Sequence, residues 1–174
     1  MKVAQFAAEL ADREAIRDCL FRYARGVDRC DEETLRSVYW EDAQDDHCLF
    51  VGTREPLIAW LLPLLRERET TQHTIGNILI RQEEAQADVE SYFEGYHVVR
   101  RDEKVAGFLQ GGRYLDRFER RDGEWRIARR KVVVDWFREY PEAGDWRKGP
   151  QRQAQIEPGG RYPDDDSYTL LRLA

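Results

Sequence analysis

Apolar positions in the first third of the chain recur with the spacing of amphipathic helices. The spacing predicts one helix over residues 12–28, with Asp12 as its N-cap, and a second over 32–40 that Asp31 can cap. A leucine-rich third helix is expected over about residues 54–67. Helices therefore dominate the N-terminal part of the chain.

The remaining segments show the alternation or the continuous apolar runs that are typical of β-strands. A polar stretch over residues 41–46 precedes a short predicted strand over 47–51, which Gly52 ends. Longer strands are predicted over residues 72–82, 87–101, 105–120 and 124–137. Asp122–Gly123 lies between the last two and is a strong hairpin signal, so these strands are expected to pair antiparallel.

The order of elements, helices first and strands afterwards, indicates an α+β fold rather than alternating β-α-β units. The length of 174 residues fits one domain. We expect that domain to span residues 1–140. An irregular tail, rich in glycine, proline, glutamine and arginine, is expected over residues 141–174.

Charge and hydropathy narrow the range of partners. A net charge of −6 argues against binding to a nucleic-acid backbone. The N-terminus lacks the apolar run of a signal peptide, and the longest apolar stretch, residues 57–65, is too short to cross a membrane. We therefore expect a soluble cytoplasmic protein without nucleic-acid or membrane partners.

Metal and disulfide chemistry are not expected from the sequence. The three cysteines form no CxxC pair, and their odd number does not fit a disulfide framework. His47 follows Asp45 and Asp46, but an acidic stretch before a short strand is more typical of a solvated loop than of a metal site. The sequence thus predicts no metal and no cofactor.

His73 is the candidate base. It is one of three histidines and opens an apolar predicted strand, and an imidazole beside a carboxylate can remove a proton near neutral pH without a metal. Tyr23 and Asp28 lie at the end of the first predicted helix. From the residues alone, two simpler interpretations stay open, namely a structural role for His73 and a cap or turn role for Asp28.

Five segments of the chain, taken together, match a known family pattern. They are Arg22–Asp31, Tyr39–Ala43, His73–Asn77, Gly112–Phe118 and Gly123–Arg130. With them the chain resembles the SnoaL-like branch of the nuclear transport factor 2-like superfamily over roughly residues 5–138. The resemblance implies a cone-shaped, curved antiparallel sheet and three N-terminal helices that enclose a pocket.

The resemblance also implies site residues. In members such as bile acid 7α-dehydratase, scytalone dehydratase and hexachlorocyclohexane dehydrochlorinase, an aspartate after the first helix orients a histidine that abstracts a proton. Asp28 and His73 match these two residues, Tyr23 matches a polar pocket residue, and Arg130 approximately matches a pocket arginine. Arg129 and Arg130 point to opposite sides of a strand, and their spacing does not decide which of them faces the pocket.

Further residues are expected to contact the substrate. Asn77 lies four residues after His73, so both should face the same side of the strand, where Asn77 binds substrate or satisfies buried backbone groups. Tyr39 and Trp40 are expected in the pocket wall, although Trp40 stands where relatives often have histidine. His97, in a central strand, is expected to be structural or interfacial.

The leading functional hypothesis is a cofactor-free lyase or isomerase, similar to a dehydratase, that acts on a hydrophobic, cyclic small molecule. The alternative is a non-catalytic small-molecule-binding protein or the small (β) subunit of a ring-hydroxylating dioxygenase. Large apolar residues expected on the outer sheet face, among them Phe93, Val99 and Phe108, favour a homo-oligomer. The family resemblance implies that it is a trimer or a dimer.

Overall fold

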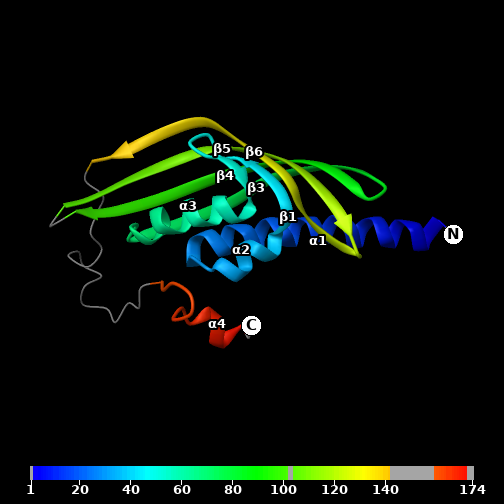
Figure 1. The fold of residues 1–174 in the computed structure, drawn as a ribbon, viewed down its shortest axis with the longest axis horizontal. Helices are drawn as coiled ribbons and strands as arrows, with labels where there is room; N and C mark the ends of the chain where they lie inside the picture. Colours follow the sequence, from blue (N-terminus) through cyan, green and yellow to red (C-terminus); the bar gives the residue numbers. More distant parts are fainter. Residues whose placement is uncertain (1, 102–103, 142–158, 172–174) are drawn as a thin grey trace.

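A long helix, two shorter helices and one curved sheet form the main body of the protein (Figure 1). The structure is a computed structural model, and it describes residues 2–101, 104–141 and 159–171. The elements are α1 (Lys2–Arg29), α2 (Glu32–Val38), β1 (Tyr39–Asp46), β2 (Val51–Thr53), α3 (Arg54–Arg66), β3 (Thr70–Glu83), β4 (Gln86–Arg101), β5 (Lys104–Arg121), β6 (Glu124–Tyr140) and α4 (Ser167–Leu170).

The six strands form one open sheet in the order β2-β1-β6-β5-β4-β3. Neighbouring strands are antiparallel except β1 and β6, which run parallel. The first three helices lie on one side of the curved sheet (Figure 1), and the α+β prediction is confirmed. Of the described helices, none is both long and apolar enough to span a membrane.

The hairpin between β5 and β6 has the expected turn. Asp122 and Gly123 both adopt positive φ, at 51° and 86°. Positive φ at both central residues is the conformation of a type I′ turn, whose twist matches that of the flanking strands. This turn fixes the register of the two longest strands in the sheet.

Helix α1 begins earlier than the sequence pattern indicates. Residues 2–11 are helical but exposed, and they project beyond the sheet (Figure 1), so their apolar side chains, Val3, Phe6 and Leu10, remain exposed. Asp12 is therefore not an N-cap. Its carboxylate accepts hydrogen bonds from Trp125 Nε1 at 2.8 Å and Gln82 Nε2 at 2.7 Å, which tie the helix to the sheet.

The predicted strand over residues 47–51 is wrong. The polar stretch before it belongs to β1, and residues 47–50 form the turn that leads into β2, with His47 N donating to Phe50 O at 2.7 Å. Asp45 is opposite Arg130 in the parallel pairing of β1 with β6. Pairing with a distant strand thus lets a polar segment form part of the sheet, with Asp45 buried.

Arg130 lies at the centre of the core with no side-chain exposure. Its Nε and Nη2 donate to the two carboxylate oxygens of Asp116 at 2.8 and 2.7 Å, and Asp116 is equally buried. The guanidinium also lies 4.0 Å from the ring centroid of Tyr23 and 4.1 Å from that of Tyr114. Arg129 is exposed, so Arg130 is the inward-facing member of the pair.

Phe93 corrects the expected composition of the outer sheet face. It is 3% exposed and stacks on Tyr114 with ring centroids 4.4 Å apart. Phe108 is also directed inward, where it stacks on His97 at 4.5 Å. The two phenylalanines therefore contribute nothing to an apolar outer surface.

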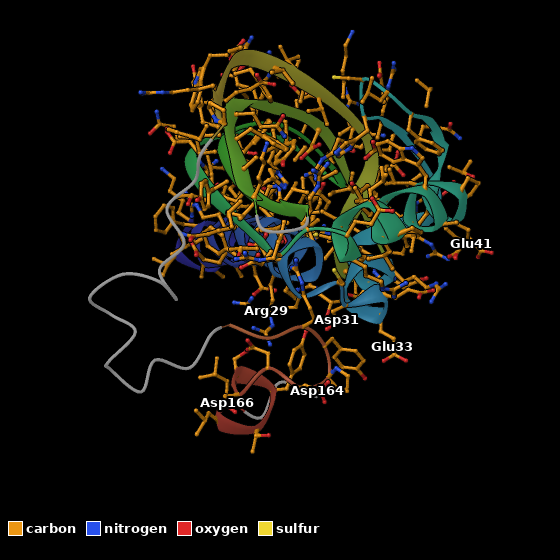
Figure 2. All side chains as sticks on the ribbon, turned by 90° about the vertical axis from the view of Figure 1, so that its left-hand side faces the viewer. Arg29, Asp31, Glu33, Glu41, Asp164 and Asp166 are labelled. Carbon is orange, nitrogen blue, oxygen red and sulfur yellow. The ribbon has the colours of Figure 1, made fainter. Side chains whose placement is uncertain are left out.

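The described part of the C-terminal segment packs against the end of α1. Figure 2 shows Arg29 and Asp31 beside the segment that carries Asp164 and Asp166. Tyr162 N donates to Arg29 O at 2.8 Å, and the carboxylate of Asp31, the N-cap of α2, accepts from the Tyr168 hydroxyl at 2.6 Å. The rest of the expected tail, residues 142–158 and 172–174, lies outside the described residues.

Replacing Asp116 with asparagine should leave Arg130 as an uncompensated buried charge. We expect Asp116→Asn to lower the free energy of unfolding by about 3 kcal/mol or more in urea denaturation. Asp88→Asn is the matched control, because Asp88 pairs with Arg117 at 2.6 Å on the exposed surface and should cost less than about 1 kcal/mol. Equal losses in the two variants would contradict this account of the core.

Candidate functional site

Asp28, in the last turn of α1, binds His73 of β3 through both of its carboxylate oxygens. Oδ1 lies 2.7 Å from His73 Nδ1, and Oδ2 accepts from the His73 backbone N–H at 2.8 Å. The two side chains are only 13% and 7% exposed. A carboxylate acceptor at Nδ1 favours the tautomer with hydrogen on that nitrogen, which leaves Nε2 as the basic atom.

His73 forms part of the wall of a cavity of about 260 Å³ between the helices and the sheet. Most of the wall is apolar, with α3 contributing Trp60 and three leucines. The polar and ionisable wall residues are Tyr23, His47, Cys48, Arg68, His73, His97, Gln110 and Tyr114. All three histidines of the chain therefore line one cavity.

Tyr23 stands between the cavity and the buried Arg130. Burial raises the pKa of Tyr23 to about 12, against the opposing charge of Arg130, so its hydroxyl keeps its proton near neutral pH. Arg130 is not part of the cavity wall, and its charge reaches the cavity through the rings of Tyr23 and Tyr114. The arginine thus polarises the site from behind.

His97 is a buried histidine whose ring nitrogens both lack a hydrogen-bond partner within the described part of the chain. Its ring meets His73 edge-on at 5.2 Å. Burial, with a smaller contribution from His73, lowers the pKa of His97 to about 3, so the ring is neutral at physiological pH. A side chain at Gly95 would meet Nε2 of both histidines at 3.2 Å, so glycine leaves room for the two rings.

His47 lies at the end of β1 and has its own carboxylate. Its Nδ1 is 3.0 Å from Asp45 Oδ1, and the Asp45 side chain has no exposure. Asp45 Oδ2 accepts from the Tyr39 hydroxyl at 2.8 Å, whose oxygen in turn accepts from Arg130 Nη1 at 3.4 Å. The sequence pattern missed this pair because it placed residues 41–46 in a solvated loop.

The three residues expected to contact substrate lie away from the cavity wall. Asn77 is exposed, because the β3–β4 pairing is irregular between Ile75 and Ile78 and the simple alternation from His73 fails. Tyr39 is buried behind the wall. Trp40 donates from Nε1 to Glu119 O at 3.0 Å. Of the predicted site, the structure thus brings Tyr23, Asp28 and His73 together, with Arg130 behind them.

Two of the solved structures with the same fold are described as a dehydratase and a dehydrochlorinase. A candidate scytalone dehydratase from Novosphingobium aromaticivorans is 24% identical, with 78% of this chain and 91% of that chain covered and a TM-score of 0.69. A hexachlorocyclohexane dehydrochlorinase from Novosphingobium barchaimii is 20% identical, with coverages of 79% and 95% and a TM-score of 0.64.

The same fold also occurs in a protein described as a dioxygenase subunit. The β subunit of a candidate aromatic-ring-hydroxylating dioxygenase from Novosphingobium aromaticivorans is 22% identical, with coverages of 76% and 94% and a TM-score of 0.59. At these identities the likeness establishes the fold alone.

A comparison with curated proteins found no match. A family model, in contrast, matches most of the main body. The model of the SnoaL-like domain matches residues 8–131, which include most of α1, most of the cavity wall and the Asp28–His73 pair. The chain belongs to the SnoaL-like family of the nuclear transport factor 2-like superfamily.

Proposed function

We propose that this protein is a lyase or isomerase in which His73 removes a proton from a carbon atom of a hydrophobic, cyclic small molecule. The observation that carries the proposal is the 2.7 Å contact between His73 Nδ1 and Asp28 at the cavity wall. A largely buried carboxylate stabilises the imidazolium that forms on proton abstraction and keeps Nε2 oriented.

Tyr23 is the proposed donor to the oxygen on which negative charge develops. Its hydroxyl is protonated near neutral pH, and Tyr23 forms part of the wall of the same cavity as His73. The buried guanidinium of Arg130, 4.0 Å from the Tyr23 ring centroid, favours that negative charge without itself contacting substrate. Asp28, His73, Tyr23 and Arg130 thus form one functional unit, with Arg130 as a positioning and electrostatic residue.

The size of the cavity limits the substrate. A dry protein cavity of about 150 Å³ holds a benzene molecule. The cavity here is about 260 Å³, so a compound of one or two rings fits it. Aromatic side chains, among them Trp60, Phe93 and Phe108, provide flat apolar surfaces for such rings.

The aligned acid–base pair favours an enzyme over a supporting subunit. A scaffold protein does not need a buried aspartate that holds a cavity histidine through two contacts, and Asp28 makes both with His73. Structural neighbours described as a scytalone dehydratase and a dehydrochlorinase also fit an elimination reaction.

We also propose that the protein self-associates. Trp136 and Phe137 on β6 are 42% and 53% exposed, and Val134 of the same strand is 45% exposed. Val134 also lines the cavity and Phe137 also stacks on Phe108, whereas Trp136, the residue next to Phe137, points to the opposite side of the strand. Large apolar side chains exposed on both sides of the end of β6 are costly in water, so a second copy is the expected cover for this end of the strand.

Base function can be tested with benzisoxazoles, in which removal of a carbon-bound proton breaks the N–O bond and releases a coloured phenolate. We expect the protein to accelerate this reaction, and His73→Gln and Asp28→Asn to slow it by about 100-fold or more. Asp18→Asn is the control, because Asp18 is on the exposed side of the same helix and pairs with Arg22. Unchanged rates in His73→Gln would refute the proposed function.

His97→Phe should stabilise the protein, because it removes an unpartnered buried polar ring and keeps the stacking on Phe108. We expect a gain of about 1 kcal/mol near pH 7 in urea denaturation. The folded protein protonates His97 only near pH 3, whereas the unfolded chain does so near pH 6.5. The wild type therefore loses stability below about pH 6.5. The difference in the free energy of unfolding between His97→Phe and the wild type should widen by up to about 1.4 kcal/mol per pH unit as the pH falls. If the free energies of unfolding of the two proteins changed with pH in parallel, the lowered pKa of His97 would be contradicted.

Light scattering at micromolar concentration tests self-association. We expect a mass that is a multiple of the 20.6 kDa chain. Trp136→Ser combined with Phe137→Ser should shift the mass toward the monomer. A stable mass near that of one chain for the wild type would show that the exposed residues of β6 need no partner.

A further inference from the structure

We infer that His47 is a second catalytic residue, which donates a proton to the departing oxygen of the substrate. The inference rests on the proposed function of His73 as base. It adds a proton donor at a different place in the cavity, and this donor indicates the chemical class of the substrate's leaving group.

The local structure holds the His47 ring toward the cavity. Ala43, Asp45 and His47 follow the two-residue alternation of β1, and Ala43 and Asp45 are each 1% exposed. The turn after β1 holds the His47 backbone through its hydrogen bond to Phe50 O, and Cys48 adopts a φ of 64°. His47 is therefore the first residue after β1, and it continues the inward-facing row of that strand into the cavity wall.

Asp45 orients the imidazole in the same way as Asp28 orients that of His73. In each pair a largely or fully buried carboxylate is within 3.0 Å of Nδ1, so Nε2 is the atom left for a ligand. The His47 side chain is 19% exposed, and its ring lies against Trp60 with centroids 6.0 Å apart. Packing and hydrogen bonding thus fix both the position and the orientation of the ring.

A chain of hydrogen bonds links His47 to the buried charged groups of the core. The linked groups are the carboxylates of Asp45 and Asp116, the guanidinium of Arg130 and the hydroxyl of Tyr39. The ring nitrogens of His97 have no hydrogen-bond partner among the described residues, whereas Asp45 holds His47 through Nδ1, which makes His47 the better oriented donor.

The sheet topology places His47 and His73 at separate positions, which fits two separate roles. His47 follows β1 and His73 lies on β3, and three strands stand between β1 and β3 in the sheet. The curvature of the sheet brings both residues to one cavity. A substrate between them can lose a proton to one histidine while its leaving group receives a proton from the other.

The proposed step balances as an elimination. His73 Nε2 takes the proton from carbon, the C–H electron pair forms the new C=C bond, and the neighbouring C–O bond breaks. The departing oxygen takes the proton of His47 Nε2 and leaves as water or an alcohol. Exchange with solvent then restores a neutral His73 and a protonated His47.

A built-in donor identifies the substrate class. A hydroxyl or ether oxygen is a basic leaving group and needs a proton, whereas a halide leaves without one. We therefore expect the substrate to carry a hydroxyl or ether oxygen on the carbon next to the one that His73 deprotonates.

Two benzisoxazoles that differ in the basicity of the departing oxygen test this role. The unsubstituted compound releases a more basic phenolate than the nitro-substituted one and depends more on a donor. We expect His47→Gln to slow the unsubstituted compound at least about tenfold more than the nitro compound. His73→Gln should slow both to a similar extent. Equal effects of His47→Gln on the two compounds would overturn the inference and leave the base function intact.

A matched pair of aspartate variants tests the orienting carboxylate. Asp45→Asn should reproduce the selective loss seen in His47→Gln, although it also disturbs the buried Tyr39 contact. Asp46→Asn is the control, because this carboxylate accepts only a 3.3 Å hydrogen bond from Cys48 N in the turn. An equal loss in both aspartate variants would argue against orientation by Asp45.

Binding of para-nitrophenol gives a measurement that does not depend on catalysis. We expect His47→Gln to weaken its binding by about tenfold in calorimetric titrations, because the phenol oxygen loses its partner, and His73→Gln to have a smaller effect. Equal binding by wild type and His47→Gln would contradict the inferred contact. Failure of the wild type to accelerate either benzisoxazole would instead contradict the proposed function of His73.

Discussion

The burial of Arg130 is the constraint on which much of the interior depends. A guanidinium without solvent requires countercharge and hydrogen-bond acceptors, and Asp116 supplies both through two contacts of 2.7–2.8 Å. The aromatic faces of Tyr23 and Tyr114 cover the remaining surface of the cation. Through Tyr39 the same group is linked to Asp45, so the charge at the centre of the core is connected to the cavity wall.

The parts of the fold that depend on local signals were predictable from sequence. Asp31 caps α2 as expected, with Oδ1 3.0 Å from Thr34 N, and Asp122–Gly123 forms the predicted hairpin turn. The predictions that failed concern residues whose placement depends on partners far away in the sequence. Asp45 is buried against Tyr39 and His47 on a strand that pairs with β6, and Asp12 bonds to side chains of the sheet. No local pattern contains that information.

The candidate site shows the same division. The sequence resemblance pointed to Asp28 and His73, whose side chains meet in the structure. Simple alternation failed for Asn77, because a bulge in β3 reverses its direction. The inward position of His97 could have been predicted, because His97 faces the same side of its strand as the core residue Phe93. The sequence pattern was interpreted with Phe93 on the outer face, so His97 was not expected in the pocket. His47 needed the register of β1, which only the three-dimensional pairing reveals.

Arg161 connects the C-terminal segment to the base of the site. Its guanidinium donates to the backbone carbonyl of Asp28, to Thr71 Oγ1 at 2.8 Å and to Arg68 O at 3.1 Å. One side chain therefore fastens the end of α1 to the start of β3, the two elements whose alignment brings Asp28 to His73. On a ribosome, these elements emerge long before residue 161. The acid–base pair then acquires the support of Arg161 only after residue 161 has been synthesised.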